Sequence, residues 1–475
     1  MVSRRRYLAV LGASVLAGCS DGSDGSTAST LSRGTDAGGR ESTTAVETEQ
    51  STTASTASDE SPTGEAVAWS IKIGSPLTAA PVVADDRIVL GSGTHDGAAR
   101  PEALGELTPA SPGYVHVVDV DGTSWSRYAA SAPVLSVGAH REHGVADGGA
   151  YAILGWYGGL GGVAQRLVRV ENGRLRWTGP SIDENRFVTA VLPDGVVTGT
   201  RDERVEEYGH RLRCRDRSGA WRWEVESGDV LAGTATNGRV YVTEGNGNTR
   251  CLDAATGETR WTYAGWAPTW RPRVEGDVVL VKRAERTGLG GSPLVALDAA
   301  TGERRFSFAG DGETAFTPVS AVRADADGTA DAVVYVASAV GDLWAVDADG
   351  RGRWRYQLDG AIVDGPEAAG GHAYAVDTSG TLHAVDAESG ERAWTRDGTL
   401  PATALGASDD GVVLLASATA TNRADRYRVR EFAHDGTVRF EYTAGGTIRS
   451  AFTHDGNAYA VTSDGSLAAF RDPER

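Results

Sequence analysis

The sequence predicts an all-β protein, a β-propeller built from four-stranded antiparallel blades. Three observations lead to this fold class. A short motif recurs at residues 251–261, 296–306 and 384–394, with a spacing of about 45 residues, which is typical of repeat architectures. Each copy ends in a large aromatic residue. Strand-like segments at the two chain ends also complement each other.

The motif describes one hairpin. In the copy at residues 251–261, an apolar strand ends at Asp253, whose carboxylate can accept backbone N–H bonds across a turn. Gly257 supplies the positive φ that the turn needs, and a second strand leads to Trp261. One hairpin cannot bury its apolar face alone, so the recurrence predicts sheets that stack on one another.

Weaker units repeat the same plan, with third-strand turns near Asp119, Glu171, Asp216, Asp347 and Asp435. We expect the aromatic residue of each outer strand to pack in the core between neighbouring blades. These blade-docking residues are Trp69, Trp125, Trp177, Trp223, Trp261, Phe306, Trp354, Trp394 and Phe440.

The chain ends predict closure of the ring. The segment around Trp69 resembles an outer strand without three preceding strands, whereas residues 457–470 supply inner strands without an outer one. Pairing the first strand with the segment near Phe470 removes exposed sheet edges. Nine repeat units can be counted over residues 65–475. Propellers typically have four to eight blades, so we expect eight, with nine as the alternative.

The repeat Ala/Cys-x-Asp-x-x-Thr/Ser-Gly-x-x-x-Trp resembles that of the PQQ-like, quinoprotein-type β-propellers. The resemblance covers roughly residues 65–475 and is strongest in the units that end at Trp261, Phe306 and Trp394. It implies that the aromatic residue docks against the next blade. Some members of the family are dehydrogenases that bind PQQ and a Ca²⁺ or lanthanide ion, often beside a disulfide of adjacent cysteines. This chain has no adjacent cysteine pair.

The N-terminus predicts export and a lipid anchor. Residues 3–8 form a twin-arginine pattern, a short apolar run follows, and residues 16–19 resemble a lipobox. We expect residues 1–18 to be a signal peptide and Cys19 to be lipidated; a plain N-terminal anchor is the alternative. Residues 19–64 are rich in Ser, Thr and acidic residues and predict a disordered tether. The expected location is the extracellular face of the cell membrane.

The charge balance excludes some partners. The formal net charge is −18, so we expect no binding to nucleic acid, whose phosphates would be repelled. Lysine occurs only at Lys72 and Lys282, so arginine supplies 44 of the 46 basic residues. An acidic, lysine-poor composition is typical of adaptation to high salt, although a GC-rich genome also favours arginine.

Cysteine usage and motifs give no sign of catalysis. Cys214 and Cys251 occupy equivalent positions in neighbouring repeats, too far apart for a disulfide, so we expect buried free thiols. No Cys/His cluster supports zinc. His140-x-x-His143 and residues 325–328 are only weak metal candidates. We predict no catalytic residues, no metal and no cofactor.

Five long insertions, at residues 93–113, 155–165, 201–210, 283–293 and 417–427, fall between the second and third strands of their units. In a propeller such insertions open on one face, together with the connections between blades. The resulting binding rim collects aromatic and arginine residues, which are enriched in contact surfaces. Its members are Trp156, Tyr157, Arg201, Arg204, Tyr208, Trp266, Trp270, Arg283, Arg286, Arg423 and Arg426.

The sequence therefore favours an exported, lipid-anchored, non-catalytic propeller, which we expect to be monomeric and to bind a protein or polymer partner through this rim. The alternative is a PQQ-dependent oxidoreductase with an atypical site. A structural spacer without a ligand is a third interpretation, because Gly-rich insertions can also be solvated loops.

Overall fold

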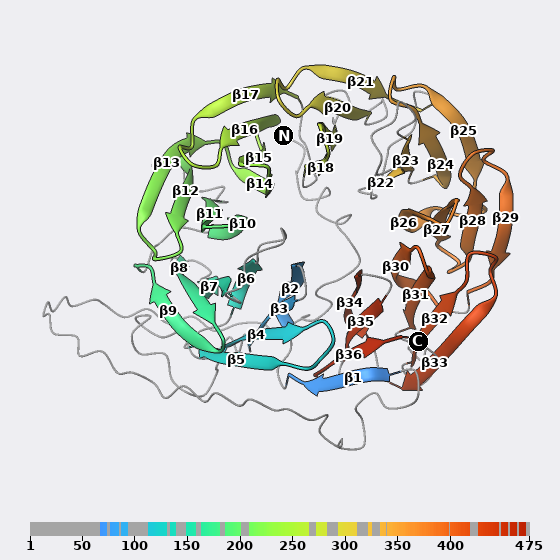
Figure 1. The fold of residues 1–475 in the computed structure, drawn as a ribbon, viewed down its shortest axis with the longest axis horizontal. Coiled ribbons are helices and arrows are strands. Elements are labelled where there is room, and N and C mark those ends of the chain that lie inside the picture. Colours follow the sequence, from blue (N-terminus) through green and yellow to red (C-terminus); the bar gives the residue numbers. More distant parts are fainter. Residues whose placement is uncertain are drawn as a thin grey trace, which may run out of the picture.

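A computed structural model describes residues 67–471 except for 74–76, 85–86, 94–112, 131–133, 139–148, 158–162, 181–185, 201–208, 266–271, 283–292, 311–321, 325–332, 339, 399, 419–425, 446–447, 455–456 and 463–464. The predicted signal peptide, Cys19 and the predicted tether lie outside the described residues. The described residues form nine four-stranded antiparallel sheets arranged as blades around a ring (Figure 1).

The blades follow one another in chain order. Blade 1 has β2 (Leu77–Ala84), β3 (Arg87–Ser92), β4 (Gly113–Asp119) and β5 (Trp125–Ala130); blade 2 has β6 (Val134–Gly138), β7 (Gly149–Tyr157), β8 (Val163–Glu171) and β9 (Arg174–Thr178); blade 3 has β10 (Arg186–Leu192), β11 (Gly195–Thr200), β12 (His210–Asp216) and β13 (Trp221–Ser227). Blade 4 has β14 (Val230–Thr236), β15 (Arg239–Glu244), β16 (Asn248–Asp253) and β17 (Thr259–Ala264); blade 5 has β18 (Arg273–Glu275), β19 (Val278–Lys282), β20 (Leu294–Asp298) and β21 (Arg304–Phe308); blade 6 has β22 (Val322–Ala324), β23 (Val333–Ala337), β24 (Asp342–Val346) and β25 (Gly352–Gln357). Blade 7 has β26 (Ile362–Ala369), β27 (His372–Asp377), β28 (Leu382–Asp386) and β29 (Arg392–Arg396); blade 8 has β30 (Ala402–Ser408), β31 (Gly411–Ala418), β32 (Arg426–Phe432) and β33 (Val438–Gly445); blade 9 has β34 (Ile448–His454), β35 (Asn457–Thr462), β36 (Ser466–Phe470) and β1 (Val67–Lys72).

The two ends of the described chain close the ring, as the sequence predicts. Strand β1 pairs with β36, with Val67 opposite Phe470 and Lys72 opposite Ser466. Figure 1 shows β1, in blue, beside the red strands of blade 9. The Trp69 Nε1–H then donates to the Val120 carbonyl of blade 1 at 3.0 Å. The first strand therefore completes the last blade and joins it to the first.

The number of blades is nine, not the eight that typical propeller sizes favour. The difference comes from the early, irregular repeats, which form complete sheets. Blade 2 turns from its third to its outer strand directly, with Glu171 opposite Arg174, so its hairpin is shorter than the repeat motif. The short turn leaves the strand pairing intact, so blade 2 is a complete four-stranded sheet.

The core lies between adjacent blades. One cluster combines Tyr241, Cys251 and Trp261 of blade 4 with Val279 and Leu297 of blade 5, all buried. Burial raises the pKa of the Cys251 thiol to about 11 and that of Cys214 to about 12. Both cysteines are buried and free, as expected from the sequence.

The outer-strand tryptophans contact the next blade through one repeated geometry. The Trp261 Nε1–H donates to the Ala299 carbonyl at 3.1 Å, and a Cβ added to Gly302 would lie 2.5 Å from the indole. The ring thus covers the glycine of the next turn, and its N–H binds that turn. The same donor–carbonyl pair joins Trp69 to Val120, Trp177 to Arg217, Trp223 to Ala254, Trp354 to Ala387 and Trp394 to His434.

Three outer-strand aromatics depart from this geometry. Trp125 stacks on the His116 ring, with centroids 6.2 Å apart, and its Nε1–H has no hydrogen-bond partner among the described residues. Phe306 lies against Gly350 of blade 6 but has no N–H to donate. Phe440 belongs to the cluster around Phe470 of blade 9.

A bulged residue precedes most of these aromatics, and it is usually arginine. The register shifts between Cys214 and Arg215, so that Arg222 is the extra residue of β13, and its guanidinium pairs with Asp194 at 2.5 Å. Equivalent arginines meet a carboxylate of their own blade: Arg176 with Glu171, Arg260 with Asp253, Arg305 with Asp277 and Asp298, and Arg439 with Glu431. The bulge thus aims a cation at the turns.

Candidate functional site

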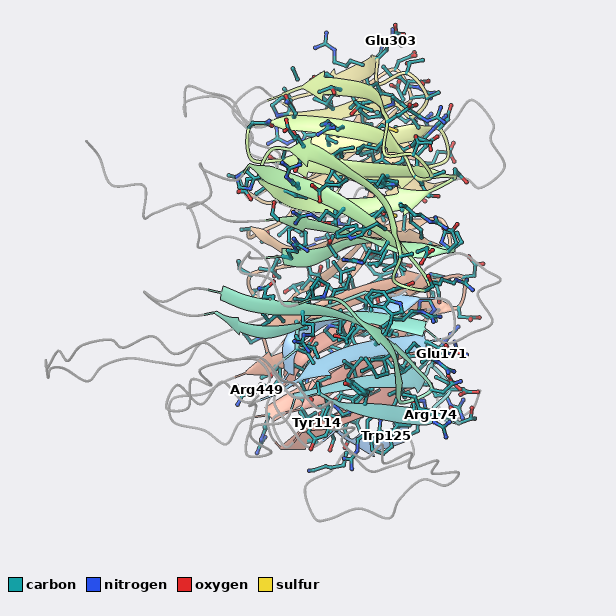
Figure 2. The ribbon with its side chains drawn as sticks, turned by 90° about the vertical axis from the view of Figure 1, so that its left-hand side faces the viewer. Tyr114, Trp125, Glu171, Arg174, Glu303 and Arg449 are labelled. Atoms are coloured by element: carbon teal, nitrogen blue, oxygen red, sulfur yellow. The ribbon has the colours of Figure 1, made fainter. Side chains whose placement is uncertain are left out.

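The propeller has two unlike faces. Strand direction places all first-to-second and third-to-outer turns on one face, here the turn face, and the second-to-third connections with the blade-to-blade links on the other, here the insertion face. Figure 2 shows Glu171 and Arg174, which belong to a third-to-outer turn, on one side of the disc, and Arg449, at the start of β34, on the opposite side. Any functional residue can be assigned to one of these faces by its place in the blade.

The five long insertions all join strand ends that lie at the insertion face. They connect β3 to β4, β7 to β8, β11 to β12, β19 to β20 and β31 to β32. In blades 4, 6, 7 and 9 the same connection is short; in blade 4, for example, β15 ends at Glu244 and β16 begins at Asn248. Two first-to-second connections that join strands at the turn face are also long, at 139–148 in blade 2 and 325–332 in blade 6, so the long connections are concentrated at the insertion face but not confined to it.

The structure describes only part of the predicted binding rim. Trp156 and Tyr157 are the last residues of β7, opposite Ala164 and Val163. Arg426 begins β32, is exposed, and pairs with Ala418 and Gly445. These three positions lie at the insertion face. The other members of the predicted rim lie outside the described residues: Arg201, Arg204, Tyr208, Trp266, Trp270, Arg283, Arg286 and Arg423.

Carboxylates at the insertion face have structural partners. The buried Asp377 carboxylate lies 3.3 Å from His383 Nε2, and the other ring nitrogen of His383 lies 3.2 Å from the Tyr356 hydroxyl of blade 6. The Asp377 carboxylate also accepts the backbone N–H groups of Ser379 and Thr381. This chain of bonds orders a turn and joins two blades, so it needs no catalytic role.

Glu367 is a titratable group that the sequence did not single out. It lies on the innermost strand of blade 7, and burial raises the pKa of its carboxyl to about 7. The positive charge of Arg273 opposes the shift, and the negative charge of Asp364 adds to it. Asp364 itself accepts the Leu405 N–H of blade 8 at 2.7 Å. Glu367 therefore changes charge near neutral pH.

The described residues contain no group of three or more His, Cys, Asp or Glu side chains placed to hold a metal ion. The two weak metal candidates of the sequence, at His140 and at residues 325–328, fall outside the described residues. No helix within the described part of the chain is long and apolar enough to cross a membrane.

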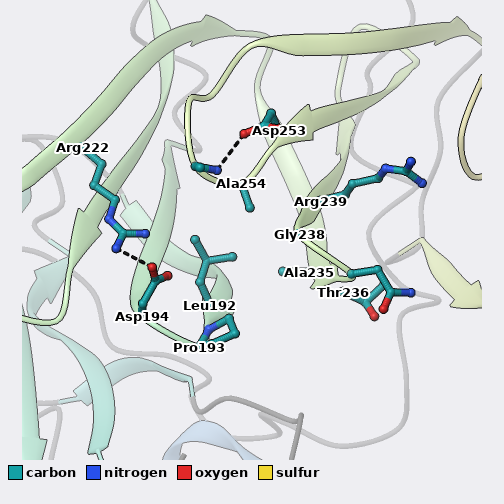
Figure 3. A pocket seen from close by; sticks show the side chains of 12 residues that line it. Leu192, Pro193, Asp194, Arg222, Ala235, Thr236, Gly238, Arg239, Asp253 and Ala254 are labelled. Carbon is teal, nitrogen blue, oxygen red and sulfur yellow. Dashed lines mark hydrogen bonds and ion pairs between the residues drawn. The ribbon is translucent and has the colours of Figure 1, made fainter.

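A groove of about 350 Å³ lies on the turn face between blades 3 and 4. Its walls are the first-to-second turns of both blades and the third-to-outer turn of blade 4 (Figure 3). Leu192, Ala235 and Ala254 supply apolar surface, and the Asp194–Arg222 ion pair closes one side. Sequence reasoning missed this groove, because it depends on which residues of two blades meet.

Comparisons with known proteins agree with the repeat pattern. A PQQ-like family model, described as outer membrane protein assembly factor BamB, matches residues 209–330 and 314–424. BamB from Moraxella catarrhalis is 19% identical over 66% of this chain and 94% of that chain, with a TM-score of 0.46. Quinohemoprotein alcohol dehydrogenase from Comamonas testosteroni is 14% identical over 85% and 76%, with a TM-score of 0.46. The C-terminal WD40 domain of Sif2 is 8% identical over 84% and 97%, with a TM-score of 0.49.

A search of curated proteins found no match. The matched residues run from the third strand of blade 3 to the second strand of blade 8, and the remaining blades continue the same four-stranded plan. The described residues form a β-propeller, and its residues 209–424 are similar to the PQQ-like repeat family.

Proposed function

We propose that this protein is a non-catalytic scaffold that binds a protein or polymer partner through its insertion face. In this proposal the twin-arginine signal exports the chain, and a lipid on Cys19 holds it at the extracellular face of the cell membrane. The propeller contributes a rigid disc, and the insertions contribute the contact residues. Rigid scaffolds that carry variable loops are a common way to build binding surfaces.

The observation that supports this proposal best is that five of the long connections join strands at the insertion face, against two at the turn face. The predicted tether, residues 19–64, precedes Val67, which pairs with Phe470 at the turn-face end of blade 9. The insertions open on the opposite face. An anchor on one side and elaborated loops on the other suit a protein that presents a surface away from its attachment.

The partner is more specifically a protein in our proposal. The matched family model is described as an outer membrane protein assembly factor, a role that requires contact with other proteins. The acidic composition of this chain points to a different cell envelope, so only the protein-binding role is proposed here.

The test is site-specific photo-cross-linking on intact cells. A photoreactive residue replaces Arg426, which is exposed at the insertion face, and in a control variant it replaces Glu303, which is exposed at the turn face. We expect partner adducts from position 426 and not from position 303. Equal yields from both positions would contradict a partner site on the insertion face.

Two further measurements address the anchor and the non-catalytic role. A Cys19→Ser variant should be released into the medium, and retention at the membrane would contradict lipidation at that residue. Purified protein should show no dye reduction with PQQ and Ca²⁺. Saturable PQQ binding together with turnover would replace the scaffold proposal by the oxidoreductase alternative.

A further inference from the structure

Three blades carry a buried carboxylate where the second or third strand meets the insertion face. Glu244 ends β15 and forms an ion pair with Arg250 of the same blade at 2.9 Å. Asp342 begins β24 and forms an ion pair with Arg355 of the same blade at 2.7 Å. Asp377 ends β27 in the same way. The cations at this end of blades 4 and 6 are therefore neutralised within their own blade.

Blades 8 and 9 have no carboxylate at these strand ends. The second strands end at Ala418 in blade 8 and at Thr462 in blade 9. The third strands begin at Arg426 and Ser466. Small or hydroxyl side chains thus take three of the four places, and a cation takes the fourth. An arginine at this end of blade 8 or blade 9 has no carboxylate at these strand ends to pair with.

The junction of these two blades brings two exposed arginines to neighbouring positions. Arg426 of β32 lies opposite Ala418 of β31. The adjacent Ser417 accepts the backbone N–H of Ile448, in blade 9, on its hydroxyl oxygen at 3.2 Å. Arg449 follows Ile448 directly and is exposed, as Arg426 is. Figure 1 shows blades 8 and 9 side by side, and Figure 2 shows Arg449 on the insertion side of the disc.

Neither guanidinium has a counter-ion within the part of the chain that the structure describes. Arg426 and Arg449 form no ion pair and no side-chain hydrogen bond with a described residue. Lys72, the exposed last residue of β1, adds a third cation at the same end of blade 9. The whole chain has 64 acidic and 46 basic residues. Arg426, Arg449 and Lys72, here called the arginine patch, are therefore a local reversal of the overall charge.

We propose that the arginine patch binds an acidic segment of the partner protein, an inference that rests on the proposed function of the insertion face. A guanidinium can hold a carboxylate through two parallel N–H···O bonds, which are stronger than bonds between neutral groups. A short acidic segment meets only the patch. A nucleic acid carries charge along its whole length, so its phosphates beyond the patch would be repelled by the acidic remainder of the chain.

The first test reverses the charge of the patch on intact cells. A photoreactive residue replaces Thr443, which is exposed near the insertion-face end of β33, two residues before the partner of Arg426 in the strand pairing. Adding Arg426→Glu and Arg449→Glu should lower the yield of partner adducts by about tenfold or more. The control adds Arg174→Glu and Arg304→Glu, two exposed arginines of the turn face. It changes the net charge equally and should leave the yield unchanged.

The second test uses a defined probe, a fluorescent octaglutamate peptide, with the purified full-length protein. Fluorescence anisotropy should show binding to the parent and to the turn-face control, and an affinity lower by about tenfold or more in the double variant of the patch. Lysine at both patch positions keeps the charge, so it should bind better than glutamate does. An absence of binding to the parent, or equal affinity in the two glutamate variants, would overturn the proposal. So would an oligothymidylate of the same length that binds as tightly as the peptide.

The results separate this inference from the proposed function. Partner adducts that form equally in the patch variant and in the turn-face control would refute the arginine patch and leave the scaffold in place, because the partner would still contact the insertion face. An absence of adducts from both position 426 and position 443 in the otherwise unchanged protein would refute the scaffold, and the arginine patch with it.

Discussion

Each blade junction depends on a small set of residues, of which the turn glycine is the least replaceable. Gly257, Gly302 and Gly390 have φ values near +75°, and each lies beneath an indole of the preceding blade. The positive φ requires a residue without a Cβ, and so does the ring above it. Two independent constraints on one position explain why the repeat motif keeps its glycine even where other positions vary.

Alanine substitutions should separate these two constraints. Gly238 has φ +69°, and a Cβ there would meet nothing, so Gly238→Ala should lose only about 1 kcal/mol of unfolding free energy from the left-handed conformation. Gly302 has φ +74°, and a Cβ there would lie 2.5 Å from the Trp261 ring, so Gly302→Ala should lose a further 1–3 kcal/mol or so by overpacking. Urea unfolding measures both. Equal losses would mean that the indole can move aside.

Glu367 should make stability depend on pH. Its folded pKa of about 7 lies above the ordinary value of 4.5. A carboxyl whose pKa is raised on folding destabilises the native state when it ionises, so its cost is absent below pH 4.5 and grows as the pH rises through 7. Glu367→Gln should therefore gain stability relative to the parent at pH 8, by an amount on the order of 1–3 kcal/mol, and not at pH 4.

Thermal unfolding of both proteins at the two pH values gives this comparison. Because both chains carry the same remaining acidic groups, the difference between them isolates Glu367. A Glu367→Gln variant that is equally destabilised at both pH values would show that the side chain acts through packing and hydrogen bonds, and that its ionisation contributes little.

Among the strands, β1 is the one that closes the ring of blades. β1 supplies the outer edge of blade 9, and Trp69 joins that blade to blade 1. A chain that starts at residue 74 would expose the β36 edge and remove the indole contact, so it should melt several degrees lower and associate through the free edge. Calorimetry and sedimentation compare it with a chain that starts at residue 65.

The same truncation allows a rescue experiment. A synthetic peptide of residues 65–73 should bind the shortened chain and restore its melting temperature, because it replaces both the strand pairing and the Trp69 contact. A peptide with Trp69→Ala keeps the strand but not the indole, and should restore less. A shortened chain that melts with the parent would show that ring closure contributes no stability.

The sequence alone predicted the hairpins and the closing strand, but it did not predict every contact between blades. The Asp–Gly turn and the following aromatic residue are local signals, and they identified the hairpins and the closing strand. The bulged arginine was also visible, as the pair Arg-Trp or Arg-Phe in Arg222–Trp223 and Arg305–Phe306, but it is meaningful only once the register shows an extra residue there. The groove lies between Leu192 and Ala254, which belong to different blades, so no single segment could reveal it.

The net negative charge of the whole molecule arises largely from acidic residues that recur in the repeated unit. Many described turns carry acidic residues, and several of these are held by arginines of the same blade, as Arg305 is held between Asp277 and Asp298. These pairs fix local geometry, but acids exceed bases by 64 to 46 over the chain. A disc with such an excess repels itself, and its stability must depend on the salt around it.

Two opposing effects of salt can be weighed. Surface ion pairs such as Arg305–Asp277 each contribute about 0–1 kcal/mol, and salt weakens them. Salt also weakens the mutual repulsion of the excess carboxylates, and at about 1 M the screening length is only about 3 Å. Repulsion acts between many more groups than the pairs do, so the melting temperature should rise by several degrees between roughly 0.1 M and 2 M KCl.

Removal of exposed carboxylates should imitate added salt. Glu258, Glu303 and Glu388 are exposed residues on the turns of three blades, and changing all three to Gln lowers the negative charge without removing a buried contact. The triple variant should melt higher than the parent in low salt and the same in high salt, because screening already cancels repulsion there. A melting temperature that falls as KCl is added would mean that the arginine pairs outweigh the repulsion, and the acidic composition would then need another explanation than life in salt.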